Sequence, residues 1–471
     1  MISTKPKSKS KGRWANRALC SLIATFVGFV ALSLPAHAAL TPAQIKVYGA
    51  APESERVHFL IGRAKIGQYQ LAIDLLQKFP LQGPHAANRT LYIEGLILNG
   101  QGDLTGAVGK YRAALANDPS LTLVRTELAE TLVRLGENDS AKHHLQLLQV
   151  DAPDPKVAEG IRSFIDRLDA SHPMTFSGFV SIAPSTNVNS GSSHDTVYSA
   201  NPIFKDSPYL DISASKMQSG VGLSAGVSAG YSKRLGNHWE AVLAGDVSGQ
   251  VYLDKNYNSF GLSQSAEMRY HLSQGYVGFG GIANQVFDPN ANNLLVDGLA
   301  YHGFGPRVSF LYNLGQHDQV KGSAVYEWRD FANSGFNDGR DYRGDLAWSH
   351  SFNASLDVFA KTGYERLVTP IAFNSFGSAF VGLGLRKDLP WGITANVSAE
   401  GRYTQFDGEN PVAFMTRTDE RLNAGLSITK RDWDIFGFAP VISYSYTRNF
   451  SNIALWDFDA HNFDFRMTKD F

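Results

Sequence analysis

A strict alternation of apolar and small or polar residues begins after Pro173 and continues to the C-terminus. Its clearest example places Val221, Leu223 and Ala225 on one face, with glycine and serine residues between them. A period of two residues indicates β-strands with one apolar face. Fourteen segments follow the pattern, each reaching the about 9 to 11 residues that a tilted strand needs to cross a bilayer. They are 174–185, 219–234, 238–253, 260–273, 275–287, 300–314, 318–331, 340–352, 355–367, 375–389, 393–405, 417–430, 434–449 and 460–471.

The connections between these segments alternate in length. Tight turns such as 235–237 and 315–317 alternate with longer connections such as 184–218, 288–299 and 406–416. Outer-membrane barrels have short periplasmic turns and longer external loops, and an even strand number returns the C-terminus to the periplasm. A soluble β-sandwich would also alternate, but it would not explain this asymmetry. We therefore predict a 14-stranded antiparallel outer-membrane β-barrel over residues 171–471.

The final segment places Phe463, Phe465 and Met467 on one face and ends at Phe471. This arrangement resembles the insertion signal of outer-membrane barrels. We expect these four residues to be read by the barrel-assembly machinery, with outer-membrane lipid around the finished barrel.

Charged residues of both signs occupy the faces opposite the apolar ones, which should line the lumen. A mixed lumen favours a salt-bridge network that braces or closes the interior over a channel selective for one sign of ion. Ordinary solvated charges are the alternative interpretation. The residues are Asp246, Glu267, Arg269, Lys321, Glu327, Arg329, Asp345, Asp357, Glu365, Glu400 and Arg402.

Residues 1–38 have the pattern of a secretory signal peptide. Basic residues between Lys5 and Arg17 precede an apolar run over 18–34, and Ala36 and Ala38 frame a cleavage site. The apolar run is short for a membrane-spanning helix, although an uncleaved anchor is the alternative. Cys20, the only cysteine, would leave with this segment, so we expect no disulfide framework and no thiolate metal site.

Residues 39–170 show helical spacing of apolar residues with a longer period superimposed. Gly102 and Ala107 are echoed thirty-four residues later by Gly136 and Ala141. This resembles the tetratricopeptide repeat (TPR), in which a small residue lets two helices cross closely and glycine makes the turn. Gly95 occupies the position of the helix-packing glycine. We predict a periplasmic domain of TPR-like α-helical repeats, with an ordinary helical bundle as the alternative.

The concave face of stacked TPR helices usually holds a peptide or protein partner. If Gly95 and Ala129 are equivalent packing positions, the inner helices direct a polar set of residues with a few apolar anchors into this face. We expect this set to bind an exported client, although any solvated face would also be polar. Its members are Arg89, Tyr92, Leu96, Asn99, Thr126, Glu130, Val133 and Arg134.

Several other functions are disfavoured. A net charge of −1 argues against nucleic-acid binding, which needs concentrated basic surface. Beyond Ala39, no apolar stretch approaches the about 20 residues of a membrane-spanning helix. The G-x-S-x-G pattern occurs at 222–226 and 226–230, but a nucleophile elbow needs a strand-to-helix turn, and these serines fall in mid-strand. We therefore expect no enzyme and no cofactor.

Two groups of residues in the sequence could in principle bind a metal ion. His143 and His144 are adjacent, so they point to different helical faces and do not form an H-E-x-x-H site. The loop with Asp288, Asn290, Asn292, Asn293 and Asp297 could hold calcium through oxygen ligands, but such loops are usually only rich in turns. We expect neither to bind a metal.

The overall arrangement resembles the surface lipoprotein assembly modulator (Slam) family. The stretch 183–189 is similar to the family's proline and asparagine motif at the top of the first strand, apart from Ser185 and Thr186 before Asn187. Residues 451–458, Asn462 and the closing 468–471 are similar to its last loop and strand. The resemblance implies a periplasmic TPR domain before a fourteen-stranded barrel. It also implies translocation of lipoproteins or other secreted proteins to the cell surface, without identifying the client.

These observations favour an outer-membrane translocation factor whose repeats capture a secreted or surface lipoprotein client. The alternative is a TPR-barrel exporter or porin for polysaccharide or small solutes. An exporter should have a lumen lined with aromatic residues or one dominant charge, whereas the expected lumen mixes both signs.

Overall fold

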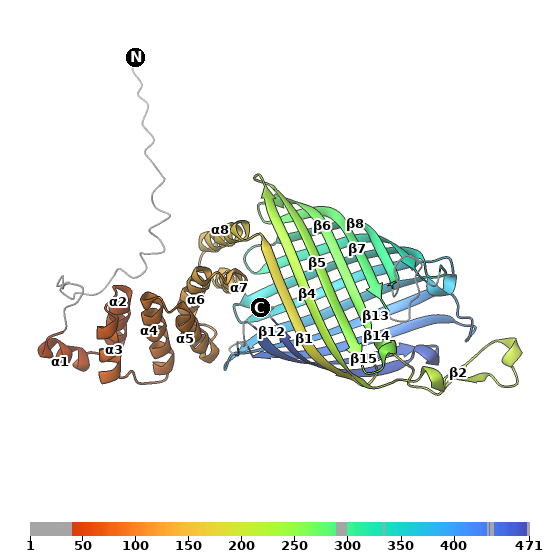
Figure 1. The fold of residues 1–471 in the computed structure, drawn as a ribbon, viewed down its shortest axis with the longest axis horizontal. Coiled ribbons are helices and arrows are strands. Elements are labelled where there is room, and N and C mark those ends of the chain that lie inside the picture. Colours follow the sequence, from red (N-terminus) through yellow and green to blue (C-terminus); the bar gives the residue numbers. More distant parts are fainter. Residues whose placement is uncertain (1–39, 289–298, 333–334, 431–432, 434–437, 469–471) are drawn as a thin grey trace, which may run out of the picture.

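The computed structural model describes residues 40–288, 299–332, 335–430, 433 and 438–468. The predicted signal peptide, Phe471 and residues 290–297 of the possible calcium loop lie outside this range. An N-terminal row of helices is followed by a barrel, and the helices lie at the end of the barrel where its first strand begins (Figure 1).

Eight α-helices make up the described N-terminal region. Gly102 and Gly136 adopt left-handed conformations, with φ of 89° and 79°, directly after two of these helices. Glycine reaches this conformation without the steric cost of a Cβ and ends the helix there. The predicted repeat glycines are therefore confirmed. The helices are α1 (Pro42–Ala50), α2 (Glu53–Lys65), α3 (Tyr69–Lys78), α4 (Ala86–Gln101), α5 (Leu104–Asn117), α6 (Thr122–Leu135), α7 (Asn138–Val150) and α8 (Pro155–Ser171).

The helical region has an apolar core that runs through successive helix pairs. Leu60, Ile93 and Leu128, on three different helices, are fully buried. Gly95 lets α4 and α5 approach, because a Cβ built there would lie 2.4 Å from the Tyr111 ring. The repeat motif therefore specifies close helix packing, as the sequence predicted.

Fourteen antiparallel strands form a closed barrel in which β1 pairs with both β4 and β16. The barrel strands are β1 (Met174–Ser185), β4 (Gly220–Leu235), β5 (Trp239–Tyr252), β6 (Ser259–Leu272), β7 (Gly275–Phe287), β8 (Leu299–Asn313), β9 (Asp318–Phe331), β10 (Gly339–Asn353), β11 (Leu356–Val368), β12 (Phe376–Leu389), β13 (Ile393–Glu409), β14 (Thr416–Lys430), β15 (Ala439–Ser451) and β16 (Phe458–Thr468).

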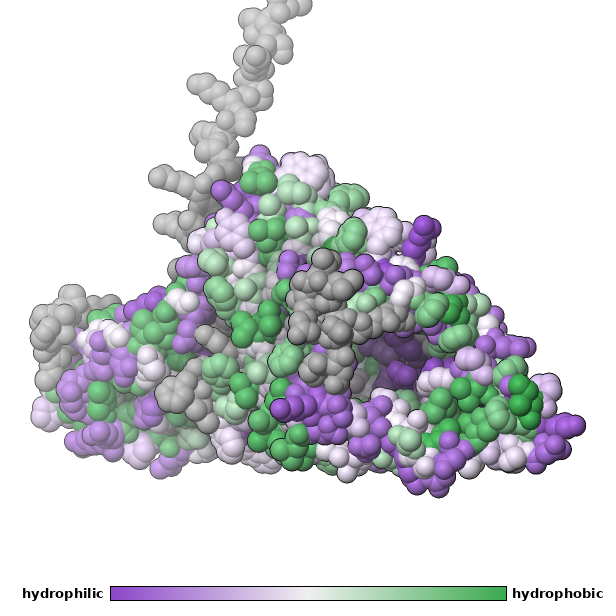
Figure 2. Space-filling model, turned by 45° about the vertical axis from the view of Figure 1, so that its right-hand side comes forward, coloured by the Kyte–Doolittle hydropathy of each residue, from purple (hydrophilic) through white to green (hydrophobic). Residues whose placement is uncertain are grey.

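The outer surface of the barrel is apolar and the lumen is polar. Val381 and Leu383 of β12 are 60% and 62% exposed, whereas Glu327 of β9 and Asp341 of β10 are fully buried inside. Figure 2 shows hydrophobic residues on the barrel exterior and a hollow lined by hydrophilic residues at one end. A closed barrel with this polarity satisfies its backbone groups internally and faces lipid, so it is an outer-membrane barrel.

The expected strands are confirmed, with differences at their ends. β13 extends to Glu409, beyond the expected residue 405, because its pairing with β14 shifts register between Gln405 and Glu409. The long connection after β1 contains a small hairpin of β2 (Thr196–Tyr198) and β3 (Tyr209–Asp211), which the sequence analysis did not identify. The connections also contain the short 3-10 helices η1 (Pro202–Phe204), η2 (Ser213–Ser215), η3 (Lys255–Tyr257), η4 (Ala372–Asn374) and η5 (Ala454–Trp456).

The helices of the described residues are too short or too polar to cross a membrane.

Candidate functional site

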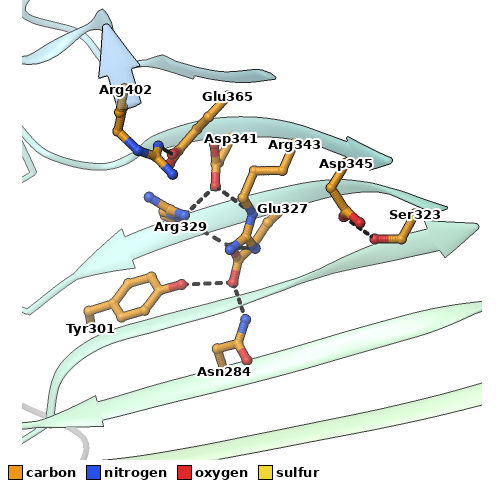
Figure 3. A network of polar contacts seen from close by, with 10 residues as sticks. All are labelled: Asn284, Tyr301, Ser323, Glu327, Arg329, Asp341, Arg343, Asp345, Glu365 and Arg402. Atoms are coloured by element: carbon orange, nitrogen blue, oxygen red, sulfur yellow. Dashed lines mark hydrogen bonds and ion pairs between the residues drawn. The ribbon is translucent and has the colours of Figure 1, made fainter. Parts of the chain in front are cut away.

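A charged network occupies the lumen side of β7 to β10, with Glu327 at its centre (Figure 3). The Glu327 carboxylate accepts hydrogen bonds from Asn284 Nδ2 at 2.7 Å and from the Tyr301 hydroxyl at 2.7 Å. It also accepts one from Arg343 Nη2 at 2.6 Å. A buried charge is stable when such partners replace the water it loses.

Asp341 extends the network along the neighbouring strand. Its carboxylate pairs with the guanidinium of Arg329 and lies 3.0 Å from Nε of Arg343. Further ion pairs and hydrogen bonds continue around the lumen, so the expected mixed-sign network is confirmed. They include Lys361–Glu400, Arg402–Glu365, Arg386–Asp357, Arg269–Glu267 and Ser323–Asp345.

The serines of the G-x-S-x-G matches lie in the middle of β4, as expected. Ser228 Oγ donates a hydrogen bond to Asp246 Oδ2 of β5 at 2.8 Å. Ser224 pairs in register with Gln250 of β5 and Ser181 of β1. Neither serine lies at the strand-to-helix turn that a nucleophile elbow requires.

The helical domain is docked on the short turns of the barrel. Gln316, in the turn between β8 and β9, donates through Nε2 to the carbonyls of Gln149, Val150 and Ala152, at 2.9, 2.9 and 2.8 Å. Three acceptors from one peptide segment surround a single amide, which fixes the end of α7 against the barrel. The sequence carried no signal for this contact, because an exposed glutamine in a turn is unremarkable.

Two neighbouring turns make similar contacts. The Ala354 N–H, between β10 and β11, donates to Asp151 Oδ1 at 2.9 Å. The Gly392 N–H, between β12 and β13, donates to the Ala116 carbonyl at 3.2 Å. The helical domain therefore spans several turns at one end of the barrel, which confirms its expected side of the membrane. With short turns on the periplasmic side, this end is periplasmic.

A cavity of about 580 Å³ remains between the docked domain and the lumen wall. Lys142, His143 and Gln146 of α7 line one side of it, and Thr175 and Ser228 belong to the opposite side. The periplasmic mouth of the barrel is thus partly covered by α7, with space left between this helix and β1, β4, β5 and β6.

The family-like motif at the top of β1 anchors the external loops. Asn187 is buried; its Nδ2 donates to the carbonyls of Gly191 and Asp459, and its Oδ1 accepts from the Gly191 N–H. His194 Nε2 lies 3.2 Å from Asp457 Oδ1. These contacts tie the loop after β1 to the start of β16, which gives the motif a structural role.

An apolar cluster continues this loop assembly. Val197, Ile212, Ala413 and Ile453 are buried together, although they come from three separate external connections. The Ser199 hydroxyl donates to the Val412 carbonyl at 2.6 Å. The external loops over this part of the barrel therefore form a folded unit.

The expected client-binding residues do not share one environment. Tyr92 and Leu96 are each 6% exposed and belong to the helical core, so the expectation that they project as anchors into an open groove is wrong for these two. Both side chains face the packed interior of the helical domain. Burial there raises the pKa of the Tyr92 phenol well above its usual value. Glu130 and Arg134 are exposed.

The polar members of the set connect neighbouring inner helices. Arg89 Nη1 donates to Glu53 Oε1 at 2.6 Å, linking α4 to α2. Arg134 pairs with Asn99, linking α6 to α4. Thr126 donates to the Thr122 carbonyl at 3.0 Å within α6, and Val133 packs against the helical core.

Glu130 adds a negative charge to this face. Partial desolvation and the neighbouring Glu127 raise the pKa of the Glu130 carboxyl above its usual value. Glu127 itself lies 3.1 Å from Lys65 Nζ of α2.

In the expected insertion signal, Phe463 and Phe465 project outward from β16 and are 43% and 49% exposed. Met467 lies on the same outward row. His143 and His144 form an edge-to-face pair, and the described residues contain no group of three or more potential ligands for a metal ion.

Comparison with known proteins identifies both regions. The barrel matches the family model described as surface lipoprotein assembly modifier over residues 175–471, and the helices match a tetratricopeptide repeat model over residues 98–161.

Individual relatives have low sequence identity to this chain but align with most of its length. Surface lipoprotein assembly modifier 1 of Haemophilus influenzae is 20% identical over 417 residues, which cover 85% of this chain and 81% of that protein. Surface lipoprotein assembly modifier 1 of Neisseria meningitidis is 22% identical over 403 residues, covering 81% of this chain and 75% of that protein. Among solved structures, a Pseudomonas aeruginosa FadL homologue aligns over 64% of this chain and 91% of its own, with 11% identity and a TM-score of 0.34. Because the family model spans nearly the whole barrel and more than half of the sequence, the chain belongs to the surface lipoprotein assembly modifier family.

Proposed function

We propose that this protein helps deliver lipoproteins or other secreted proteins to the cell surface. The helical domain captures an exported client in the periplasm, and the barrel assists its passage across the outer membrane. The names of the relatives, surface lipoprotein assembly modifiers, support the client class.

One observation carries this proposal: the helical domain is fixed across the periplasmic turns of the barrel, with a cavity between α7 and the lumen. A client bound to the repeats is thereby held beside the periplasmic mouth. Because the client is then already close to the barrel, its entry into the barrel does not require a second diffusional encounter.

The client-binding face is best tested at its exposed members. Tyr92 is unsuitable because an alanine there would remove part of the helical core. The double variant Glu130→Ala, Arg134→Ala removes two exposed charges from α6. We expect less lipoprotein at the surface of cells carrying it, measured by protease shaving and mass spectrometry.

A matched control removes charge elsewhere on the same domain. Lys156 and Glu159 are exposed on α8, and their double alanine variant should display normal amounts of lipoprotein. Both variants should keep a heat-modifiable barrel band on gels, because a folded barrel resists cold detergent. Full display with the α6 variant would defeat capture by this face. Permeation of oligosaccharides through the reconstituted protein with unchanged display would favour the exporter alternative.

We also propose that Phe463, Phe465, Met467 and Phe471 form the signal read by the barrel-assembly machinery. The outward row of Phe463, Phe465 and Met467 on β16 supports this role, because these three side chains are accessible before lipid surrounds the barrel. Deleting Phe471 should lower the amount of inserted barrel far more than deleting Asn292 from an external loop. Equal amounts of the two variants in the outer membrane would contradict the proposal.

A further inference from the structure

Two cavities lie along one wall of the barrel lumen. The inner cavity, of about 580 Å³, lies between α7 and the periplasmic ends of β1, β4, β5 and β6. The outer cavity, of about 900 Å³, begins at Ala183 and Ser185 near the external end of β1 and extends across β14 to β16. β1 therefore runs from one cavity to the other.

The wall along the inner cavity consists mainly of glycine and of small hydroxyl-bearing residues, with the Asp246 carboxylate of β5 among them. Every second residue of β4 from Gly222 to Ser232, on the lumen face, is glycine or serine. Thr175 and Ser177 of β1 and Ser265 of β6 continue this lining. A hydroxyl both donates and accepts hydrogen bonds, so it can pair with the amide or carbonyl of any peptide whatever its sequence. The opposite wall, in contrast, carries the charged network around Glu327.

On β1, Phe179 lies between the residues that line the two cavities, and Phe179 together with Arg466 is called the constriction below. The Phe179 ring of β1 lies over Gly226, where a Cβ would come within 2.5 Å of Phe179 Cε1. The guanidinium carbon of Arg466, on β16, is 4.2 Å from the centre of the same ring. Arg466 is held by Asp464, with Nη2 3.0 Å from Oδ2. The ring is therefore clamped between a bare backbone and a cation.

Ser181 provides an independent indication that this constriction receives a ligand. Its side chain lies on the lumen face of β1, between those of Phe179 and Ala183, and it is 1% exposed. Its hydroxyl has no hydrogen-bond partner among the described residues. Buried polar groups are normally paired, and an exception points to a partner missing from this state.

The constriction also lies at the seam of the barrel. β4 pairs with β1 along its whole length, from Met174 to Ser185. On the other side, the described pairing of β1 with β16 covers Phe179–Ile182 and Ser185. Phe179 and Arg466 therefore belong to the two strands that close the barrel.

We propose that an unfolded stretch of client polypeptide passes in extended form along the wall of β1, β4, β5 and β6, and that Phe179 and Arg466 close this path at rest. The small residues of this lining give the path its width, and their hydroxyl groups bind backbone without selecting sequence. When the ring moves aside, the Ser181 hydroxyl pairs with the passing backbone. This inference rests on the proposed delivery function and specifies its route.

The first test measures ion conductance of the full mature chain in planar bilayers. Phe179→Ala should raise the conductance several-fold, because it removes the ring that closes the proposed path. The control is Phe380→Ala on the charged wall. The Phe380 ring also lies over a glycine, Gly363, and the guanidinium carbon of Arg402 is 4.8 Å from its centre. This control should leave the conductance nearly unchanged. An equal or larger increase with Phe380→Ala, or no increase with Phe179→Ala, would overturn the route.

A second test does not depend on changing the constriction. Ser228→Cys and Ser323→Cys each place a thiol where a serine hydroxyl donates to an aspartate on a neighbouring strand. The sole natural cysteine, Cys20, lies in the predicted signal peptide. A long unstructured glycine and serine peptide, added to the periplasmic side of Phe179→Ala channels, should block the current reversibly. A bulky thiol reagent on Ser228→Cys should abolish this block, and the same reagent on Ser323→Cys should not.

The outcomes separate the route from the function. Loss of peptide block at both thiols, or block by an oligosaccharide and not by the peptide, would overturn the route. A different outcome is that the currents behave as expected but cells lacking the chain lose no surface lipoprotein. This result would overturn the delivery function and leave only a peptide-conducting path. Heat modifiability of each variant shows that its barrel is folded before any current is interpreted.

Discussion

The helical domain and the barrel bury opposite kinds of side chain. In the helical domain Leu60, Ile93 and Leu128 are inside, whereas in the barrel Leu383 faces outward and Glu327 is inside. Lipid takes the place of a core for the barrel, so apolar residues gain nothing by pointing into the lumen. Mutations of buried residues should therefore act through lost polar pairing in the barrel and through lost packing in the helices.

The largest effect should come from the barrel network. Glu327→Ala removes the acceptor of the Tyr301 and Asn284 hydrogen bonds and one of the two carboxylate partners of Arg343. Breaking a buried ion pair on one side costs about 3 to 5 kcal/mol. Urea unfolding of the barrel, followed by heat modifiability, should show this loss. Glu420→Ala, at an exposed position of β14, is the matched control, and equal loss for both would show that the network does not brace the barrel.

The helical counterpart is Leu128→Ala. Leu128 is fully buried on α6, and truncating a buried leucine costs about 2 to 5 kcal/mol through lost transfer energy and the cavity left behind. Thermal unfolding should show a less stable helical domain while the barrel keeps its heat modifiability. Leu123→Ala, at a position 52% exposed on the same helix, should change little. Loss of barrel insertion in Leu128→Ala would show that the two regions do not fold separately.

A smaller change in the stability of the helical domain is expected for alanine substitutions at two of its glycines, one destabilising and the other, the control, stabilising. Gly95→Ala pushes a Cβ against the Tyr111 ring, and overpacking of this kind costs about 1 to 3 kcal/mol. Gly109→Ala meets nothing within 4 Å on the exposed side of α5, and alanine in a helix is more stable than glycine by about 1 kcal/mol. Unfolding of the two variants should shift in opposite directions. A shift in the same direction would contradict the packing role of Gly95.

The difference between the two regions also explains what sequence reasoning could find. Alternation predicted the fourteen strands because the two sides of a barrel wall face different solvents, and the repeat glycines predicted the helix turns. The mixed charges on the polar faces, such as Glu327 and Arg329, predicted a network. These features depend on local spacing alone.

Other features depend on registers and contacts between distant segments. Nothing in the sequence pairs Asn284 with Glu327, because that contact depends on the register of three strands. Gln316 docks α7 through the carbonyls of a remote segment, and main-chain acceptors have no signature in sequence. Helical spacing predicted which way the Tyr92 side chain points, and therefore an open face. It could not predict that Glu127 of the neighbouring α6 lies there and accepts a hydrogen bond from the Tyr92 hydroxyl.

The smallest expected effect concerns the junction between the two regions. Gln316→Ala removes an amide whose two N–H groups are shared among three carbonyls at the end of α7, and a hydrogen bond contributes about 0.5 to 1.5 kcal/mol. Amide hydrogen exchange around Ala152 should become faster, with both regions still folded. Gln274→Ala, in the exposed turn between β6 and β7, should leave that exchange unchanged. Unchanged exchange in Gln316→Ala would mean that the other turns alone hold the domain.

The central claim, delivery of lipoproteins to the surface, is tested most directly by shaving intact cells with protease and quantifying the released lipoprotein peptides. Cells lacking this chain should lose at least one lipoprotein from the shaved fraction while keeping it in the total outer membrane, and the full chain should restore it. An unchanged set of shaved lipoproteins in cells lacking the chain would contradict the account.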